Sequence, residues 1–400
     1  MRLLNLKIYT MRGGVIEHGF IETADAKITR IGGMDELGAD EQIPNLDAEG
    51  LKICAGDFKE LNSAVVSLDG KICTPGFIDA HTHIGMWEDS LGFPGEDGNE
   101  DTDPCTPQLR AIDGINPFDI CFKEAALAGV TTVCCSPGSS NPVAGQTAIL
   151  KTQGRSVDDM IIKSPAGIKF ALGENPKSTY RGKDETPVTR MATAAIIREQ
   201  LKKTRQYMEK QYMDDNEPDF DFKCESMIPL LKGEIQAHFH AHRADDICTA
   251  LRICDEFDLK PVIVHGTEAP LISDILTEKR VPVLYGPVMT DRSKPELKNL
   301  SESVPAELYR NGVKTAVISD HPEVPEKFLS ICAGLCGAGD NGDFPALQSV
   351  TNIPAEILHI GDRVGSLGSG MDADLLIFDS EPVLGFKKPS YVFIDGKIVK

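Results

Sequence analysis

The stretch "KICTPGFIDAHTHIGMWED", residues 71–89, ends a short apolar run with two histidines two positions apart. Side chains alternate between the two faces of a β-strand, so His81 and His83 should point to the same side. Two neutral imidazoles on one side can both offer a nitrogen lone pair to a single metal ion. A lone His-x-His pair also fits two exposed or hydrogen-bonded histidines, so the rest of the chain has to decide.

Further short apolar runs follow this stretch, and helical patterns separate several of them. The eight expected strands are "TPGFIDAH", "VTTVCCS", "TAILKT", "GIKFAL", "IQAHFH", "KPVIVHG", "VPVLYG" and "KTAVISD". Between two of them, "ADDICTALRICDEFDL" (residues 244–259) places apolar residues at the i, i+3, i+4 and i+7 positions of an amphipathic helix. This alternation predicts βα units with a parallel sheet, and eight units predict a closed (β/α)8 TIM barrel.

Both ends of the chain have a different pattern, with β-branched runs broken by Gly and Asp and little helical period. Neither end is long enough for a good core of its own. We therefore predict an α/β protein in which a small β-sandwich is built from both termini. The expected division is residues 1–72 and 359–400 for the sandwich and residues 73–358 for the barrel.

Residues able to bind a metal gather at the predicted strand ends, where (β/α)8 barrels carry their active sites. They follow or end the first, fourth, fifth, sixth and eighth strands: His81 and His83, Lys169 with Glu174 just beyond it, His238, His240 and His242, His265, and Asp320. Together with His321, seven of the nine histidines of the chain belong to this set or adjoin it. Such joint placement favours a metal centre over scattered structural histidines.

The motifs "PGFIDAHTH" and "SDHP", with histidines at the fifth and sixth strand ends, resemble those of the amidohydrolase superfamily. The resemblance extends to "GSLGSGMDADLLIFD" and "VFIDGKIV" near the C-terminus, and so covers essentially the whole chain. Among members, "ALGENPK" and "HAHRADDI" are most similar to imidazolonepropionase-related hydrolases. The resemblance implies a centre of one or two divalent ions, zinc first with iron or manganese as alternatives, that activates water. It also identifies His240 as the ligand of the fifth strand.

An acidic ligand is needed to hold two dications close together, and two residues are candidates. An unprotonated Lys169 can add carbon dioxide to form a carbamate whose two oxygens bridge two ions, as a strand-four lysine does in binuclear members of the family. Glu174 is the alternative acid. Asp320 is expected to contact the metal, to accept the proton of the attacking water and to pass it to the leaving nitrogen.

Residues near the expected ligands are candidates for substrate contacts. His242 and Arg243 follow His240, although pairing of Arg243 with a nearby aspartate is an equal alternative. Gln146 lies in "PGSSNPVAGQTAI", a polar, Gly-rich segment after the second strand. The acidic segment from Glu88 to Pro117 leaves the barrel just after His83. It either covers the pocket mouth or forms solvated surface.

The expected activity is metal-dependent hydrolysis of a C–N bond in an amide, a cyclic amide or a small peptide-like substrate. Deamination of an aminated heterocycle is the alternative. However, related deaminases and imidazolonepropionase carry His-x-x-Glu at strand five, where this chain has Arg243. A non-catalytic scaffold like the dihydropyrimidinase relatives is less favoured, because those proteins lose metal ligands and this chain keeps every one expected.

The charge of −20 over 400 residues argues against nucleic acid and anionic membranes as partners. The opening "MRLLNLKIYTMRGG" lacks the apolar centre of a signal peptide, and no apolar run approaches the ~20 residues of a membrane span. The eleven cysteines form no C-x-x-C pair, which favours reduced thiols. We therefore expect a cytoplasmic protein that acts on a small molecule and assembles as a homo-oligomer.

Overall fold

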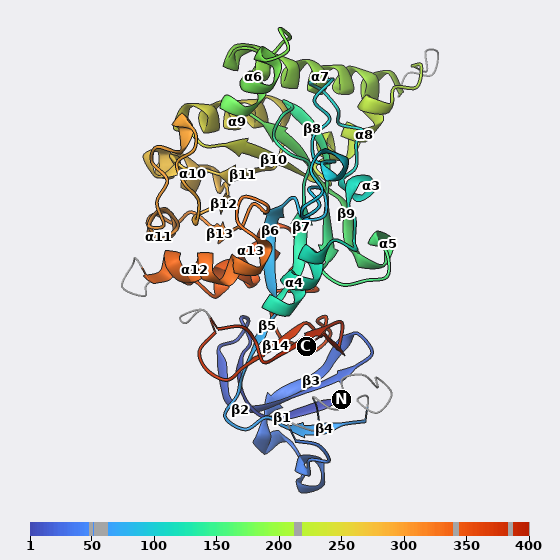
Figure 1. Cartoon of the computed structure of the whole chain (residues 1–400), viewed down its shortest axis with the longest axis vertical. Helices are drawn as coiled ribbons and strands as arrows, with labels where there is room; N and C mark the ends of the chain where they lie inside the picture. The colour runs from blue at the N-terminus through green and yellow to red at the C-terminus, as the bar shows by residue number, and fades with distance from the viewer. Residues whose placement is uncertain (48–50, 52–62, 212–217, 339–343, 383–386, 400) are drawn as a thin grey trace.

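The computed structural model of this chain describes residues 1–47, 51, 63–211, 218–338, 344–382 and 387–399. Two eight-stranded sheets organise these residues, one from both chain ends and one from the middle (Figure 1). The first sheet contains β1 (Arg2–Tyr9), β2 (Val15–Ala24), β3 (Lys27–Gly33), β4 (Val65–Ser67), β5 (Ile72–Pro75), β14 (Leu375–Phe378), β15 (Tyr391–Ile394) and β16 (Lys397–Ile398). The second contains β6 (Phe77–Thr82), β7 (Val130–Cys135), β8 (Val143–Lys151), β9 (Ile161–Ala171), β10 (Gln236–Ala241), β11 (Pro261–His265), β12 (Val283–Tyr285) and β13 (Thr315–Val317).

Helices cover the outside of the second sheet and lie in the segments that connect its strands (Figure 1). The α-helices are α3 (Ala111–Gly114), α4 (Ile120–Ala128), α5 (Val157–Met160), α6 (Glu174–Arg181), α7 (Arg190–Gln211), α8 (Phe222–Leu231), α9 (Ala244–Phe257), α10 (Ser273–Lys279), α11 (Val304–Arg310), α12 (Leu329–Ala338) and α13 (Asn352–Ile357). Short 3-10 turns are η1 (Met34–Glu36), η2 (Ala39–Gln42), η3 (Phe93–Gly95), η4 (Ala269–Ile272), η5 (Pro295–Leu297), η6 (Glu326–Phe328) and η7 (Gln348–Val350). Among the described residues, no helix is both long and apolar enough to cross a membrane.

The second sheet is a nearly closed barrel in which the strands follow the order of the chain from β6 to β13. All eight strands expected from the sequence are present. The first and last strands meet where the Ser319 amide donates to Asp79 Oδ2 at 2.9 Å and the His83 amide donates to the His321 carbonyl at 3.0 Å. The predicted α/β fold, a (β/α)8 barrel with a small β domain from both termini, is confirmed.

One strand departs from the expected parallel sheet, because β8 runs antiparallel to both β7 and β9. A parallel crossover needs a dozen or more residues, and the connection from Ser136 to Pro142 is shorter than that. The chain therefore turns back as a hairpin after β7. The reversal places residues 136–142 at the same rim as the carboxyl ends of the parallel strands.

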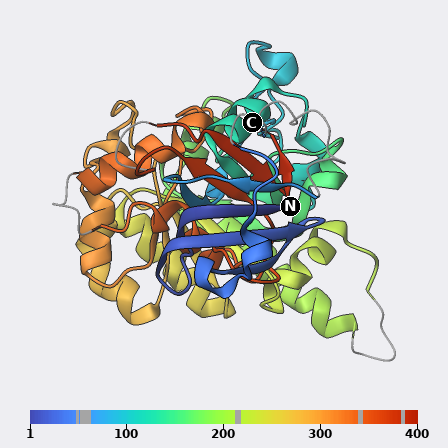
Figure 2. The same ribbon diagram turned by 90° about the horizontal axis from the view of Figure 1, so that it is seen from below.

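The strands from the two chain ends lie side by side (Figure 2). β14 pairs with β5, and β5 pairs with β1, so the C-terminal strands are hydrogen-bonded to the N-terminal ones through β5. The division expected at residues 72 and 73 falls inside β5, which belongs to this terminal sheet. The domain limits stay a prediction, and residues 48–50, 52–62, 383–386 and 400 of the terminal parts lie outside the described residues.

Apolar side chains pack on both faces of the barrel wall and hold the strand ends in position. Outside the wall, Phe170 of β9 stacks on Phe239 of β10 with ring centroids 4.7 Å apart, beneath α7, α8 and α9. Inside, Val262 and Leu284 join Ile353 of α13, which caps the lower end. Burial of each such side chain contributes about 1.5–3 kcal/mol, which stabilises the framework that carries the rim.

Candidate metal centre

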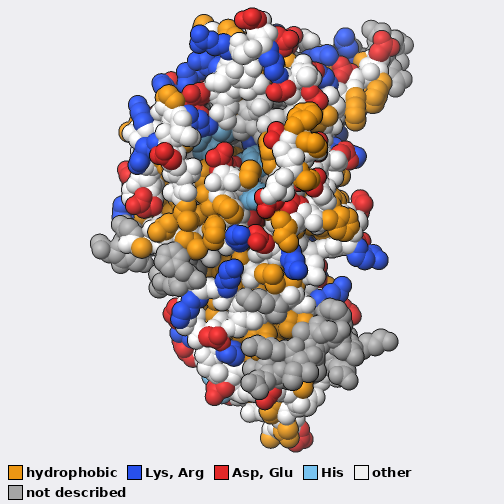
Figure 3. All heavy atoms as spheres, in the orientation of Figure 1, with side chains coloured by type: hydrophobic (Ala, Val, Ile, Leu, Met, Phe, Trp, Pro, Cys, Tyr) orange, Lys and Arg blue, Asp and Glu red, His pale blue; other side chains and the backbone are white. Residues whose placement is uncertain are grey.

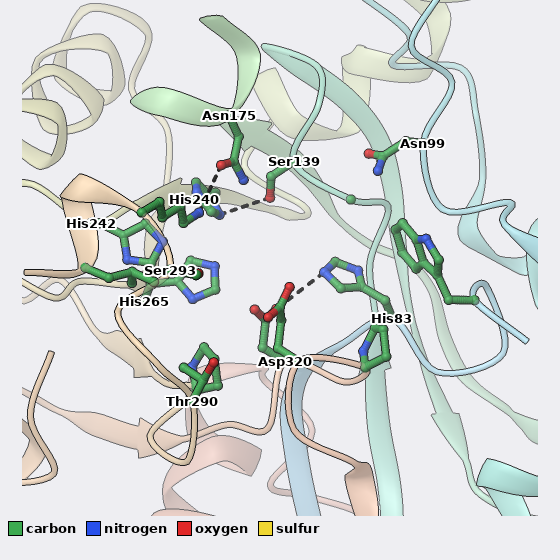
Figure 4. A pocket seen from close by; sticks show the side chains of 17 residues that line it. His83, Asn99, Ser139, Asn175, His240, His242, His265, Thr290, Ser293 and Asp320 are labelled. Atoms are coloured by element: carbon green, nitrogen blue, oxygen red, sulfur yellow. Dashed lines mark hydrogen bonds and ion pairs between the residues drawn. The ribbon is translucent and has the colours of Figure 1, made fainter. Parts of the chain in front are cut away.

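The ligand-type residues expected at the strand ends converge on one rim of the barrel. His81 lies in β6, Lys169 in β9 and His240 in β10, while His265 ends β11 and Asp320 follows β13. All five are buried. Figure 4 shows His240, His242 and His265 together on one side of a pocket, with Asp320 and His83 facing them. Figure 3 shows histidine side chains at the floor of a hollow in this face of the barrel.

Asp320 is the carboxylate around which the first group of histidines is arranged. Its Oδ1 lies 3.4 Å from Nε2 of His81 and 3.4 Å from Nε2 of His83. The candidate donor atoms of His81, His265 and Asp320 lie within 4.8 Å of one another. Burial raises the pKa of Asp320, but the neighbouring His265, His81 and His83, when they carry a proton, bring it well below its ordinary value. Asp320 is therefore an ionised carboxylate at neutral pH.

The backbone at this rim is held in an uncommon conformation. His265 has φ of 75° and Asp320 has φ of 57°, both in the left-handed region that side chains other than glycine seldom adopt. Such conformations persist where the surrounding structure imposes them, and they cluster at functional sites. Here they turn both side chains toward the pocket, which they line.

Each of four histidines has its Nδ1 engaged by a neighbouring oxygen. His83 Nδ1 donates to the Ser136 carbonyl and His265 Nδ1 to the Gly286 carbonyl, both at 2.7 Å. The partners of His240 and His242 are hydroxyls: Ser139 Oγ lies 2.9 Å from His240 Nδ1, and Thr267 Oγ1 lies 2.8 Å from His242 Nδ1. A carbonyl can only accept, so His83 and His265 carry their proton on Nδ1. Their Nε2 atoms therefore present lone pairs, as metal-binding histidines do.

Burial also favours the neutral form of these histidines. It is the main cause that lowers the pKa of His265 to about 4 and holds the pKa values of His81, His240 and His242 well below the ordinary value. An imidazole must be neutral to bind a metal. The site is therefore already in its ligand form near pH 7.

Lys169 lies at the centre of the same rim with a side chain that is fully buried. Its Nζ is 3.4 Å from His81 Nε2 and donates to the Pro137 carbonyl at 3.2 Å. Burial lowers the pKa of Lys169 to about 7. Much of this amine is unprotonated near neutral pH, which is the form that can add carbon dioxide.

Three predicted residues lie outside the two groups of converging donors. Glu174 begins α6, and its backbone amide donates to Glu296 Oε2 at 3.1 Å. Arg243 precedes α9 and pairs with Asp245 at 2.8 Å on the surface. Gln146 of β8 has its Nε2 3.5 Å from the Pro107 carbonyl. None of the three belongs to the described residues that line the pocket, so their predicted roles stay predictions without support from this geometry.

The pocket over the histidines has a volume of about 400 Å³, which suits a small molecule. Besides expected residues, it is lined by residues that sequence reasoning missed: Trp87, Asn99, Gly138, Ser139, Asn175, Pro287, Thr290, Ser293, Lys294, Leu297, Pro322 and Glu323. Asn175 could have been found from the sequence, because it follows the candidate ligand Glu174 in the segment "ALGENPK". Most of the others lie in loops whose paths no periodic pattern predicts.

The segment 88–117 forms one wall of this pocket through Asn99, with Trp87 just before it. Two lysines, one just after α6 and one in α8, form ion pairs with the acidic segment. Lys183 pairs with Asp101 at 2.7 Å and Lys223 pairs with Asp103 at 2.6 Å. Of the two interpretations of this segment, a wall at the pocket mouth fits the structure better than solvated surface.

A rim of buried imidazoles and an aspartate at the strand ends of a (β/α)8 barrel suits an enzyme that binds a divalent ion. The family model of the amidohydrolase family matches residues 72–399, and the chain belongs to this family. It is therefore an enzyme of the hydrolase class. Members of the family generally use divalent metals, and the two groups of converging donors fit that use.

Individual relatives agree with this assignment. The amidohydrolase of Thermotoga maritima MSB8, known from a crystal structure, is 37% identical in sequence to this chain. The two structures superpose with a TM-score of 0.89, and the match covers 100% of this chain and 99% of that chain. The amidohydrolase tasK of Hapsidospora irregularis is 28% identical over an aligned length of 383 residues. The alignment covers 86% of this chain and 38% of that protein, so this chain spans less than half of that relative. A prolidase crystallised with N-methylphosphonate-L-proline shares the fold at 18% identity, with a TM-score of 0.62 and coverage of 100% and 99%.

Proposed function

We propose that this enzyme hydrolyses a C–N bond in an amide, a cyclic amide or a small peptide-like substrate, with water activated by a divalent metal. The observation that carries the proposal is the convergence of buried Nε2 atoms and the Asp320 carboxylate at the floor of a pocket of about 400 Å³. The pocket is too small for a folded protein partner and suits a small-molecule substrate.

The donor set fits zinc best, with iron or manganese as alternatives, because imidazole and carboxylate are ligands that all three accept. His81, His83 and Asp320 would hold one ion. His240 and His265 would hold a second, with a carboxylated Lys169 or Glu174 as the acidic ligand. When bound, a divalent ion lowers the pKa of its water toward ~7 and polarises a carbonyl.

Asp320 has the position and charge of a general base. Its carboxylate is ionised, lines the pocket and lies beside both His81 and His83. It would accept the proton of the attacking water and return it to the leaving nitrogen. Asn99, Ser139 and Asn175 line the opposite walls with polar groups that can orient a substrate amide (Figure 4).

Deamination is less well supported, because the position three after His240 holds Arg243, which points to Asp245 at the surface. The same argument weakens the imidazolonepropionase reaction itself. No group in this position can shuttle a proton as the glutamate of those enzymes does.

The test combines metal analysis with a hydrolysis screen of the metal-loaded protein. We expect at least one divalent ion per chain, and loss of the ion at the His81, His83 and Asp320 position from the variant with both His81→Ala and His83→Ala. The screen should contain N-acyl amino acids, dipeptides, lactams, hydantoins and aminated heterocycles. Ammonia release from heterocycles alone would favour the deaminase. Protein that neither holds nor takes up zinc or manganese would contradict the proposal.

A further inference from the structure

Glu296 is a buried acid beside the histidine cluster, and no sequence pattern indicated it. It lies in η5, and the exposed fraction of its side chain is 1%. Its Oε1 lies 3.9 Å from His240 Nε2 and 3.8 Å from His242 Nε2. Neither Glu296 Oε1 nor His240 Nε2 takes part in a hydrogen bond with any described residue. Two polar atoms without a hydrogen bond therefore face each other in the interior.

The spacing of these atoms is close to that of the ligands of one ion. Zinc bonds to nitrogen and oxygen are about 2.0–2.2 Å long, so two donors of a tetrahedral ion lie ~3.3–3.6 Å apart. The distances from Glu296 Oε1 to His240 Nε2 (3.9 Å) and to His242 Nε2 (3.8 Å) are slightly longer than this spacing. The donor atoms of His240, His242 and His265 lie within 4.8 Å of one another, which small side-chain movements reduce to bonding range. The three imidazoles therefore lie close together, and Glu296 Oε1 adjoins two of them.

The histidines of this group are oriented for that position. His242 and His265 stack with ring centroids 4.5 Å apart, and His240 stands edge-on to both of them. The Nδ1 atom of each has a hydrogen-bond partner outside the cluster: Ser139 for His240, Thr267 for His242 and Gly286 for His265. Only the Nε2 atoms remain to face Glu296. The Nε2 of His265 also lies near Asp320, but one lone pair can serve only one ion.

An ion pair with Lys294 is the competing explanation for Glu296. Lys294 Nζ lies 3.2 Å from Glu296 Oε1, without the geometry of a hydrogen bond, and also donates to Asn175 Oδ1 at 2.9 Å. The lysine side chain is 26% exposed, whereas the carboxylate is almost fully buried. The ammonium of Lys294 lies on one side of Oε1 in the same pocket, and no hydrogen bond joins Oε1 to His240 or His242. A buried carboxylate is costly unless a cation satisfies it.

We propose that His242 and Glu296 complete, with His240 and His265, a divalent-metal position separate from the one at His81, His83 and Asp320. The proposal rests on the proposed function only in taking His240 and His265 as metal ligands. Three neutral imidazoles and one carboxylate form a set suited to zinc. Glu296 then supplies the negative charge for this ion, and His242 is a ligand rather than a substrate contact.

The experiment measures metal per chain by elemental analysis after loading with zinc and dialysis, for wild type and single variants. We expect Glu296→Gln and His242→Gln each to lose about one ion per chain relative to wild type. The double variant of His81 and His83 should keep the ion at the Glu296 position. Glu323→Gln removes an exposed acid from the same pocket, and Lys294→Met removes the partner lysine. Both controls should keep the wild-type content.

Cobalt loading gives a second readout that does not depend on activity. We expect the strong visible absorption of four-coordinate cobalt in the double variant of His81 and His83, and its loss when Glu296→Gln is added. Wild-type metal content and an unchanged cobalt spectrum in Glu296→Gln would overturn the inference, even if the substrate KM rose. Loss of the ion from Lys294→Met as well as from Glu296→Gln would assign Glu296 to the ion pair and overturn it too. In both cases the hydrolase proposal would stand, whereas a wild-type protein without any metal would contradict both.

Discussion

Burial sets the protonation state of the individual residues in this site. The histidines at the rim are desolvated, and the pKa of His265 falls to about 4 while those of His81 and His240 lie well below the ordinary value. Neutral imidazole nitrogens and the Asp320 carboxylate line the pocket together. These are donors that a divalent ion accepts, which is why the site is suited to a metal.

The first prediction concerns Asp320. Asp320→Asn should keep much of the metal but lower kcat by ~10²–10⁴, because an amide cannot accept the proton of the attacking water. Steady-state kinetics with the substrate found in the screen, together with metal analysis, provide the measurement. Asp258→Asn is a matched control, because Asp258 has the same left-handed backbone (φ 57°) at the exposed end of α9. Near-normal turnover of the Asp320 variant would remove this residue from the mechanism.

The second prediction concerns Lys169. If its buried amine carries a carbamate, metal-free protein should need bicarbonate together with metal to recover activity. Lys169→Ala should lose activity and regain part of it with acetate or propionate, which can occupy the vacated space. Full reactivation in bicarbonate-free buffer would exclude the carbamate. Glu174→Gln is compared with Lys169→Ala. If Glu174→Gln loses a metal ion and Lys169→Ala does not, Glu174 is the acidic ligand.

Among the elements, the reversed strand β8 has the largest consequence for the site. Because β7 and β8 form a hairpin, residues 136–142 lie at the catalytic rim instead of leading into a helix. This loop supplies the Ser136 carbonyl to His83, the Ser139 hydroxyl to His240 and the Pro137 carbonyl to Lys169. One short loop thus contacts Lys169 of β9, His240 of β10 and His83, which follows β6.

The third prediction follows from this hairpin. Ser139→Ala removes the hydroxyl 2.9 Å from His240 Nδ1, so the imidazole loses its anchor. Loss of such an outer contact typically weakens metal affinity about 10–100-fold. Competition with a chelator of known affinity measures the change. Ser140→Ala in the same loop should bind metal like wild type, and equal affinities for the two variants would contradict the anchoring role.

Across the whole molecule, a buried ion cluster joins the barrel to the terminal sheet. Lys151 at the end of β8 pairs with Asp374 at 2.6 Å, Asp395 at 3.0 Å and Asp372 at 3.1 Å. Burial would raise the pKa of Asp372, but Lys151 and the neighbouring cations hold it below the ordinary value. The cluster connects chain segments more than two hundred residues apart, so it makes the two sheets depend on each other.

The fourth prediction tests that dependence. Lys151→Met leaves buried carboxylates without their shared cation and should lower the free energy of unfolding by about 3–5 kcal/mol. Urea unfolding followed by circular dichroism gives the midpoint for the variant and for wild type. Lys202→Met on the exposed face of α7 is the control and should change stability by no more than ~0.5 kcal/mol. An unchanged midpoint for Lys151→Met would show that the cluster contributes little.

Much of the fold and part of the site could be predicted because they follow from local patterns. The runs around His81, His265 and Asp320 carry their own strand signal, and a residue at a strand end of a barrel must lie on the rim. Arg243 shows where this reasoning stops. It follows a strand directly, yet its side chain turns to Asp245 at the surface. Position along the chain does not determine side-chain direction at a helix start.

The sequence by itself determined the class of fold, the eight barrel strands and the strand ends at which metal-binding residues stand. Periodicity and strand-end placement act over a few residues, so they can be recognised without knowledge of the rest of the chain. Only the tertiary structure decided the reversed direction of β8 and the approach of Glu296 to His240 and His242. These features depend on loop paths and on packing between segments far apart in the chain, where the energy of one contact depends on all the others.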